Sequence, residues 1–267
     1  MSHHPALRSL LFLLSLLVAA GASAQTQAPA KPFEPTVGQA GKDVVWVPTP
    51  QALVDKMLDM AKVTKDDFVM DLGSGDGRTV ITAAKRGARA LGIEYNPDMV
   101  ELARGNAAKE GVSVRATFER GDLFEADLSK AQVITMFLLP SINMKLRPKL
   151  LDLKPGTRIV SNSFTMEDWT ADETGNVTEN CTSWCTALLW IVPAKVAGSW
   201  QMPQGELKLT QQFQMLQGTL GGATISDARL RGDEITFSAG GVKFTGTVSG
   251  NTMKGTSSAG TWMASRK

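Results

Sequence analysis

The segment VMDLGSGDGR, residues 69–78, decides how this chain folds. Its first residues are apolar and suit a short buried strand, and its glycines suit a turn in which the backbone approaches a ligand closely. A helix from about Asp76 to Arg86 is expected next, ended by Gly87. The segment therefore predicts a strand, a turn and a helix, with a ligand site at the turn.

The spacing of the glycines limits the kinds of ligand that this turn can bind. The dinucleotide fingerprint G-x-G-x-x-G needs a glycine at position 78, where this chain has Arg78, and the P-loop pattern G-x-x-x-x-G-K-[ST] is also missing. The chain instead has G-x-G-x-G at Gly73, Gly75 and Gly77, and the carboxylate of Asp71 stands two residues earlier. This arrangement suits a ligand with a cationic amino-acid end and no phosphate.

Strands and helices alternate around this segment. Short apolar strands are expected at 68–72, 90–95, 112–119, 133–137, 157–161 and 186–192. Helices are expected from Pro50 with Thr49 as its N-cap, at 76–86, at 96–111, and at 142–153, where Pro148 predicts a kink or a break. Repeated β-α-β units predict an α/β fold, a Rossmann-like, doubly wound, mostly parallel sheet with helices on both faces.

The composition changes after Pro193. The segment 198–267 is rich in Gly, Thr, Ser and Gln, and short alternating runs are separated by glycine turns. This pattern predicts a small antiparallel all-β domain, a sheet or barrel, that folds independently of the preceding domain at 42–197.

The N-terminus has the pattern of a signal peptide, residues 1–24. Arg8 supplies a positive charge, the apolar run 10–20 is too short to span a bilayer, and residues 22–24 (Ala-Ser-Ala) resemble a cleavage site. Residues 25–41 are proline-rich without periodicity and predict a flexible linker. We therefore expect an exported protein, periplasmic or associated with the envelope, with no transmembrane segment after cleavage.

Cleavage would remove both histidines, His3 and His4, and lower the formal net charge from +2 to +1. A chain without histidine excludes Ser-His-Asp and Cys-His catalysis and His-ligated zinc, so no metal is expected. Near-zero net charge argues against binding to nucleic acid. Cys181 and Cys185 are expected to be free thiols, because strand residues four apart lie ~13 Å from each other and a disulfide needs Cα atoms within roughly 7 Å. A turn near Cys181 would be needed to bring the two residues within bonding distance.

Polar side chains end the next two strands of the predicted sheet. Glu94 closes the second strand, where an acid can accept both ribose hydroxyls of a nucleoside. Asp122 follows the third strand and can accept from an adenine amino group, while the backbone N–H of Leu123 serves a ring nitrogen. Tyr95 can pack on the adenine face. Each residue alone is more often a solvated acid, a turn residue or packing, but their common register favours a nucleoside site.

With these elements the sequence resembles the class I methyltransferases that use S-adenosylmethionine, over roughly residues 45–193. The blocks VPTPQ (47–51), DLGSGDGR (71–78), RGARALGIEYNP (86–97) and FLLP (137–140) resemble one branch. That branch contains the lysine methyltransferases of the ATP synthase c-subunit and the adenine nucleotide translocase. The resemblance implies a protein-lysine N-methyltransferase with S-adenosyl-L-methionine as cofactor and an acceptor protein at or near a membrane.

Four residues are candidates for the substrate channel: Trp46, Thr49, Phe137 and Leu138. Core packing and a helix cap explain them equally well. The loop after the fourth strand has no N-P-P-[YFW] motif, which argues against amino-methylation of DNA or RNA. No catalytic base is identified, so a carboxylate, Tyr95 or water is left as proton acceptor. Two other functions stay open: methylation of a quinone or lipid, and a non-catalytic cofactor-binding protein of the envelope.

Overall fold

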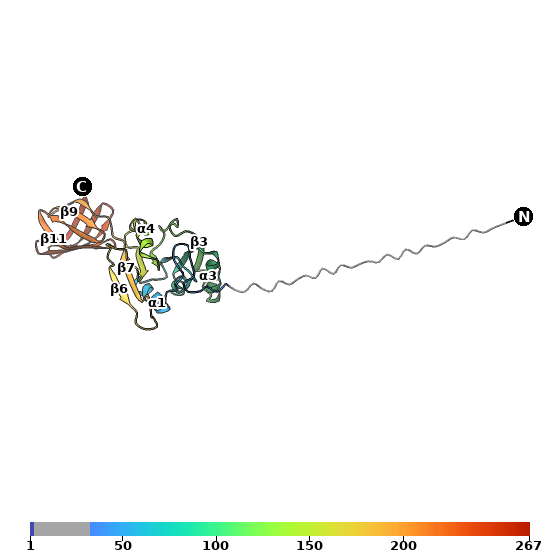
Figure 1. Ribbon diagram of the computed structural model, residues 1–267. Helices are drawn as coiled ribbons and strands as arrows, with labels where there is room; N and C mark the ends of the chain where they lie inside the picture. The colour runs from blue at the N-terminus through green and yellow to red at the C-terminus, as the bar shows by residue number, and fades with distance from the viewer. Residues whose placement is uncertain (3–32) are drawn as a thin grey trace. The chain divides into compact units, whose positions relative to one another are not determined.

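The computed structural model describes residues 1–2 and 33–267. The expected signal peptide and most of the expected linker, residues 3–32, lie outside the described residues. Within Glu34–Lys267 a mixed sheet with its helices comes first, and an antiparallel barrel follows (Figure 1). No helix among the described residues is long and apolar enough to cross a membrane.

Four helices accompany the sheet: α1 (Gln51–Met60), α2 (Arg78–Lys85), α3 (Pro97–Lys109) and α4 (Pro140–Leu151). The start of α3 is as expected, because the Asn96 side chain caps the helix by accepting a hydrogen bond from the Asp98 N–H at 2.9 Å. The expectation for α1 is wrong: its N-cap is Pro50, without a side-chain cap. The Thr49 hydroxyl is instead buried and accepts a hydrogen bond from Asn162.

Other features of the helices and strands also differ from the expected ones. Pro148 lies inside α4, but the helix continues past it and is not split. The third strand begins at Ala116 rather than at Val112, because the Arg115 N–H donates to the Val112 carbonyl in a turn. The start of the third strand thus depends on a backbone hydrogen bond that the apolar pattern does not encode.

The sheet strands are β1 (Phe68–Leu72), β2 (Arg89–Glu94), β3 (Ala116–Arg120), β4 (Val133–Met136), β5 (Arg158–Asn162), β6 (Glu173–Asn176) and β7 (Thr186–Ile191). Their order is β3-β2-β1-β4-β5-β7-β6. Strands β1 to β5 are parallel, and β7 is antiparallel to both β5 and β6. The prediction of a mostly parallel sheet is confirmed. Strand β6 was not predicted, because its residues ETGN carry no apolar alternation.

Helices cover both faces of this sheet, as the short apolar strands predict. Consecutive strand residues point to opposite faces. Val69 and Val133 join a core with the apolar residues of α1, α2 and α3. Their neighbours Met70 and Ile134 join the core on the other face, where α4 packs. The two buried faces explain why these strands are apolar throughout rather than alternating.

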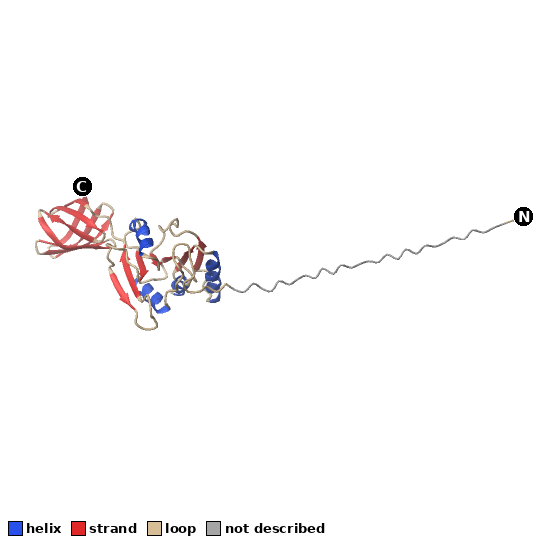
Figure 2. Ribbon diagram, viewed as in Figure 1, coloured by secondary structure: helices blue, strands red, loops and turns tan. Residues whose placement is uncertain are grey.

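The C-terminal part is a closed antiparallel barrel built from strands and tight turns (Figure 2). Its strands are β8 (Gly198–Met202), β9 (Gly205–Gln212), β10 (Met215–Leu220), β11 (Ala223–Arg231), β12 (Glu234–Ala239), β13 (Val242–Ser249), β14 (Thr252–Ser257) and β15 (Gly260–Arg266). The side chains of Phe237, Phe244 and Trp262 pack together in its core. A barrel of this size is filled by its own side chains, and the prediction of an antiparallel β-rich segment is confirmed.

The barrel contacts the sheet's own core through the turn between β9 and β10. Phe213 in that turn stacks on the buried Trp169, with ring centroids 5.8 Å apart. Arg229 of β11 donates to Asp172 at 2.9 Å, just before β6. The expectation that 198–267 folds independently of 42–197 therefore stays a prediction, and these contacts decide how it is tested.

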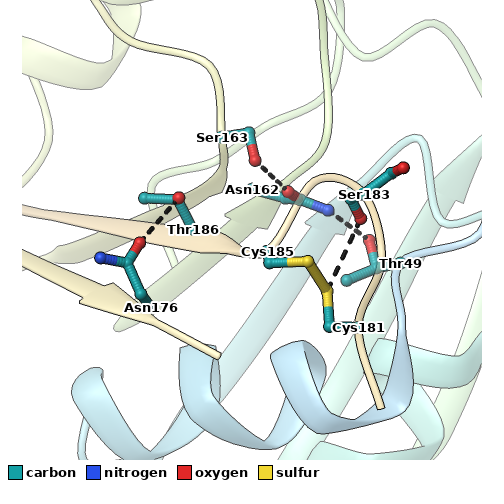
Figure 3. The surroundings of a disulfide bond; sticks show 8 residues. All are labelled: Thr49, Asn162, Ser163, Asn176, Cys181, Ser183, Cys185 and Thr186. Atoms are coloured by element: carbon teal, nitrogen blue, oxygen red, sulfur yellow. Dashed lines mark hydrogen bonds between the residues drawn. A yellow bond between two sulfur atoms is a disulfide. The ribbon is translucent and has the colours of Figure 1, made fainter. Parts of the chain in front are cut away.

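A disulfide joins Cys181 to Cys185 (Figure 3), so the expectation of two free thiols is wrong. That expectation assumed an extended chain between the two residues. The chain instead bends before β7, where Asn180 and Trp184 have positive φ angles of 53° and 59°. The bend brings the two Cα atoms to 5.8 Å, within the reach of a disulfide.

Candidate active site

A pocket lies where the strand order reverses, at the carboxyl ends of β1 and β4. In open α/β sheets this switch point is where ligands bind. The lining side chains surround about 1050 Å³, part of it open to solvent. The predicted site residues that line it are Trp46, Thr49, Asp71, Gly73, Gly75, Glu94, Tyr95, Asp122, Leu123, Phe137 and Leu138. The structure thus brings together every predicted site residue except Gly77.

The three glycines of the turn after β1 have positive φ angles, but they serve different purposes. A Cβ on Gly75 would lie 2.7 Å from the Trp46 indole nitrogen, so this glycine allows Trp46 to approach the loop. A Cβ on Gly77 would lie 2.7 Å from the Phe118 ring. Gly77 therefore permits close packing of α2 against β3, away from the pocket, and its predicted contact with the ligand is not what the geometry favours.

Asp71 is a buried carboxylate at the end of β1 that faces the pocket. It accepts a 2.6 Å hydrogen bond from the Thr135 hydroxyl, on the neighbouring strand β4. Burial raises the pKa of Asp71 to about 7, and the nearby acids Asp76 and Glu94 act in the same direction. A buried carboxylate of this kind is stabilised in its charged form by a cation. Thr135 was not predicted, although a lone polar residue in the apolar strand VITM is a usable signal.

Glu94, at the end of β2, holds the glycine loop in place. Its two carboxylate oxygens accept hydrogen bonds from the backbone N–H groups of Gly75, at 3.0 Å, and Asn96, at 2.9 Å. A carboxylate oxygen has two lone pairs, so each oxygen can accept one further hydrogen bond. Glu94 is therefore placed both to fix the loop and to bind hydroxyl groups in the pocket.

Asp122 follows β3 and already has partners on both oxygens. It accepts from the Phe124 N–H at 2.9 Å and from the Lys42 ammonium at 2.5 Å. The hydrogen bond from Lys42 has the largest effect in holding the pKa of Asp122 below its ordinary value, and the one from Phe124 acts in the same direction. The Lys42 ammonium also lies 5.0 Å from the centre of the Tyr95 ring. Asp122 and Tyr95, two of the three residues predicted to contact adenine, thus share one cationic neighbour.

That neighbour belongs to a pocket wall of which the sequence predicted only Trp46 and Thr49. Residues 39–49, which precede α1, line the pocket, although the sequence has no apolar periodicity there. Backbone hydrogen bonds between Gly38 and Trp46 and between Trp46 and Gln39 close this segment on itself. The end of this segment is also held in place, because the Arg78 guanidinium donates a hydrogen bond to the Thr49 carbonyl at 2.9 Å.

The Thr49 hydroxyl is fixed by the end of β5. Asn162 is fully buried and donates from its amide to the Thr49 hydroxyl at 3.3 Å (Figure 3). The Ser163 hydroxyl donates to the Asn162 amide oxygen at 2.9 Å. This arrangement places an oriented hydroxyl in the pocket wall. Asn162 was not predicted, although a lone amide at the end of an apolar strand marks its position.

The end of β4 forms the apolar side of the pocket. Leu138 is buried beside the glycine loop, where a Cβ on Gly73 would lie 3.3 Å from its side chain. Phe137 is half-buried and packs against two further aromatic rings, those of Phe164 and Trp184. The pocket therefore has acidic groups on the side of β1, β2 and β3 and an apolar, aromatic side at β4.

A mostly parallel sheet of this order with acids at three consecutive strand ends defines the class I methyltransferase fold. A solved structure with this likeness is that of an RNA methyltransferase from Salinibacter ruber in complex with S-adenosyl-L-homocysteine. It is 48% identical to this chain with a TM-score of 0.53, and the match covers 56% of this chain and 96% of that one.

Sequence comparison identifies the family within this class. The family model of the ANTKMT methyltransferase domain matches residues 71–173, which end before the barrel. A protein-lysine N-methyltransferase of Saccharolobus islandicus is 49% identical over 133 residues, 49% of this chain and 83% of that protein. The human ATP synthase c-subunit lysine N-methyltransferase is 35% identical over 128 residues, so the match spans 48% of this chain and about half, 54%, of that relative. The chain belongs to this methyltransferase family, and the resemblance seen in the sequence is confirmed.

Proposed function

We propose that this chain is a protein-lysine N-methyltransferase that uses S-adenosyl-L-methionine. The observation that carries the proposal is the pocket at the β1–β4 switch point, which has a buried carboxylate at one end and an aromatic wall at the other. The cofactor, when bound, supplies a methyl group on a positively charged sulfur. The names of the relatives add the acceptor, a lysine side chain.

The polar residues of the pocket match the polar groups of this cofactor. Asp71 is the partner for the cationic amino group of the methionine end, because a nearby cation stabilises its buried charge. Glu94 has free lone pairs for the two ribose hydroxyls. Asp122 and the backbone N–H of Leu123 would bind the adenine edge, with Tyr95 on its face.

The apolar side of the pocket prepares the acceptor. A lysine amine attacks a methyl group only when it is neutral, and an apolar surrounding lowers the pKa of an amine by disfavouring its charge. Phe137, Leu138 and Trp46 supply this surrounding. The amine loses its proton to a carboxylate, Tyr95 or water before transfer, so the protein's main task is to place the nitrogen in line with the methyl group.

The test is methyl transfer by the purified full chain from isotopically labelled cofactor to lysine-containing proteins and peptides. Peptide mass spectrometry should find the label on lysine nitrogen, and the variant Glu94→Ala should lose most of the transfer. Glu101→Ala, which changes an exposed acid on α3, is the matched control and should keep full activity.

Other acceptors are outcomes of the same experiment. Transfer to RNA alone would favour the activity for which the Salinibacter ruber protein is described. The formal net charge of +2 and the sequence FLLP after β4 speak against it. Transfer to a quinone or lipid alone would indicate a small-molecule methyltransferase. Cofactor binding without any transfer would indicate a binding protein of the envelope.

We also propose that the acceptor protein lies at or near a membrane and that the enzyme is exported. The proposal rests on the N-terminal pattern of residues 1–24 and on relatives named for the ATP synthase c-subunit and the adenine nucleotide translocase. Mass spectrometry of membrane proteins from cells with and without this gene is the test. Loss of a lysine methyl mark in the deletion strain would support the proposal, and an unchanged set of lysine marks would contradict it.

A further inference from the structure

Three aromatic side chains from separate parts of the sheet meet beside the pocket. Phe137 follows β4, Phe164 follows β5, and Trp184 lies in the loop between β6 and β7. The ring centroids are 5.9 Å apart for Phe137 and Phe164, 5.9 Å for Phe137 and Trp184, and 5.1 Å for Phe164 and Trp184. We call these three residues the aromatic surface. Phe137 connects it to the pocket, because this residue is also part of the pocket lining.

The aromatic surface is open to solvent at Trp184. This side chain is 45% exposed, whereas Phe137 and Phe164 are half-buried. Exposure of a large indole to water is unfavourable, because apolar surface is more stable when it is buried. Core packing therefore does not explain the position of Trp184. The surface therefore leads from solvent at Trp184 to the pocket at Phe137.

Polar contacts hold Phe164 in this position. Its carbonyl accepts a hydrogen bond from the Ser161 hydroxyl at 2.8 Å and another from the Asn143 amide at 3.3 Å. Its N–H donates to the Asn162 carbonyl at 2.7 Å. Ser161, Asn143 and Asn162 are all fully buried. The backbone that carries Phe164 is thus fixed by side chains of the sheet interior.

The disulfide holds Trp184 in a similar way. Trp184 directly precedes Cys185, and the Cys181–Cys185 bond closes the loop around it. Its φ angle of 59° is unusual for a bulky residue, which disfavours the left-handed conformation. Such a conformation persists only when its surroundings impose it. The bond on one side and β7 on the other supply this constraint.

We propose that the aromatic surface binds the side chain of the lysine to be methylated and that the disulfide keeps Trp184 in it. The inference rests on the proposed function and assigns the acceptor subsite. Aromatic faces attract a lysine ammonium by cation–π interaction, and their apolar area suits the four-carbon stem. The amine enters charged over Trp184 and becomes desolvated as it reaches Phe137 and the pocket.

The experiment measures the kinetics of the full chain with a synthetic peptide that carries one lysine between glycine and alanine residues. The variant Trp184→Ala should raise KM for the peptide roughly 5- to 30-fold, the strength of a partly desolvated cation–π contact. The value of kcat and the Kd for S-adenosyl-L-homocysteine should stay within about twofold. Trp184→Phe should restore most of the peptide affinity. Met263→Ala, which removes another exposed apolar side chain, is the matched control.

The double variant Cys181→Ser/Cys185→Ser tests the role of the disulfide. It should raise KM for the peptide in the same direction, and it should add little to the effect of Trp184→Ala when the changes are combined. Melting temperatures within a few degrees of the unaltered protein show that the fold is intact in each variant.

Two results separate the inference from the proposed function. Lysine methylation with an unchanged peptide KM in Trp184→Ala would overturn the aromatic surface as acceptor subsite and leave the proposed function standing. Absence of lysine methylation in the unaltered protein, with transfer to RNA or a lipid instead, would overturn both.

Discussion

Lys42 donates a 2.5 Å hydrogen bond to Asp122, a residue eighty positions further along the chain. The contact ties the segment before α1 to the end of β3, and it raises the pKa of Lys42 while lowering that of Asp122. The same carboxylate is the predicted acceptor for an adenine amino group. We therefore expect the Lys42 ammonium and the adenine amino group to compete for this carboxylate.

This competition predicts the effect of Lys42→Met, which keeps the aliphatic stem and removes the charge. The affinity for S-adenosyl-L-homocysteine should rise a few-fold at low salt, because Asp122 becomes free for the ligand. Calorimetric titration measures it, with Lys65→Met, an exposed pair partner of Asp66, as control. A fall in affinity of threefold or more would show that Lys42 helps to bind the ligand instead.

Glu94→Ala should weaken cofactor binding most strongly among the single changes. It removes charge-assisted hydrogen bonds to the ribose, on the order of 1.5–3 kcal/mol, and it also frees the Gly75 N–H that positions the glycine loop. Calorimetric titration of the variant and of Glu101→Ala gives the comparison. Equal affinity in Glu94→Ala and the unaltered protein would contradict the assignment of Glu94 as the residue that binds the ribose hydroxyls.

The buried Asp71 predicts a dependence of stability on pH. Its pKa is about 7 in the folded protein and about 3.9 in an unfolded chain. Between these values the folded protein keeps a proton that the unfolded chain releases, so this group lowers the free energy of unfolding as pH rises from 4 to 7. The ligand-free variant Asp71→Asn should therefore gain up to about 4 kcal/mol at pH 8 and almost nothing at pH 4.

Urea unfolding of the unaltered protein and of Asp71→Asn at both pH values checks this expectation. The exposed Asp66→Asn is the control, and it should show no such difference. Equal stability of the Asp71→Asn variant and the unaltered protein at pH 8 would mean that the carboxylate is ionised at little cost in the fold.

Removal of the barrel tests how the two parts depend on each other. A chain that ends at Ala197 should stay folded and bind cofactor, because all pocket residues precede this point. It should melt at a lower temperature, because Phe213 no longer covers the buried Trp169 and Asp172 loses Arg229. Circular dichroism and calorimetry measure both properties. Aggregation or loss of cofactor binding would show that 198–267 is not a separate domain.

The cofactor side of this protein is readable from the sequence because it depends on local patterns. Parallel strands place their carboxyl ends at one edge of a sheet, so acids at the ends of consecutive apolar strands must converge. Asp71, Glu94 and Asp122 meet at the pocket for this reason, and the glycines between β1 and α2 mark the turn.

The acceptor side and the loops depend on contacts that no local pattern encodes. The tertiary structure alone places Lys42 on Asp122, joins Cys181 to Cys185, and brings Trp184 against Phe137. Lys42, Cys181 and Trp184 lie in segments without apolar periodicity, and the course of the backbone there depends on its tertiary contacts. The sequence by itself determined where the acidic strand ends lie, since apolar runs and the turns that follow them are local patterns. The tertiary structure decided which side chains lie opposite these strand ends, because contacts between distant segments form only when the sheet has formed.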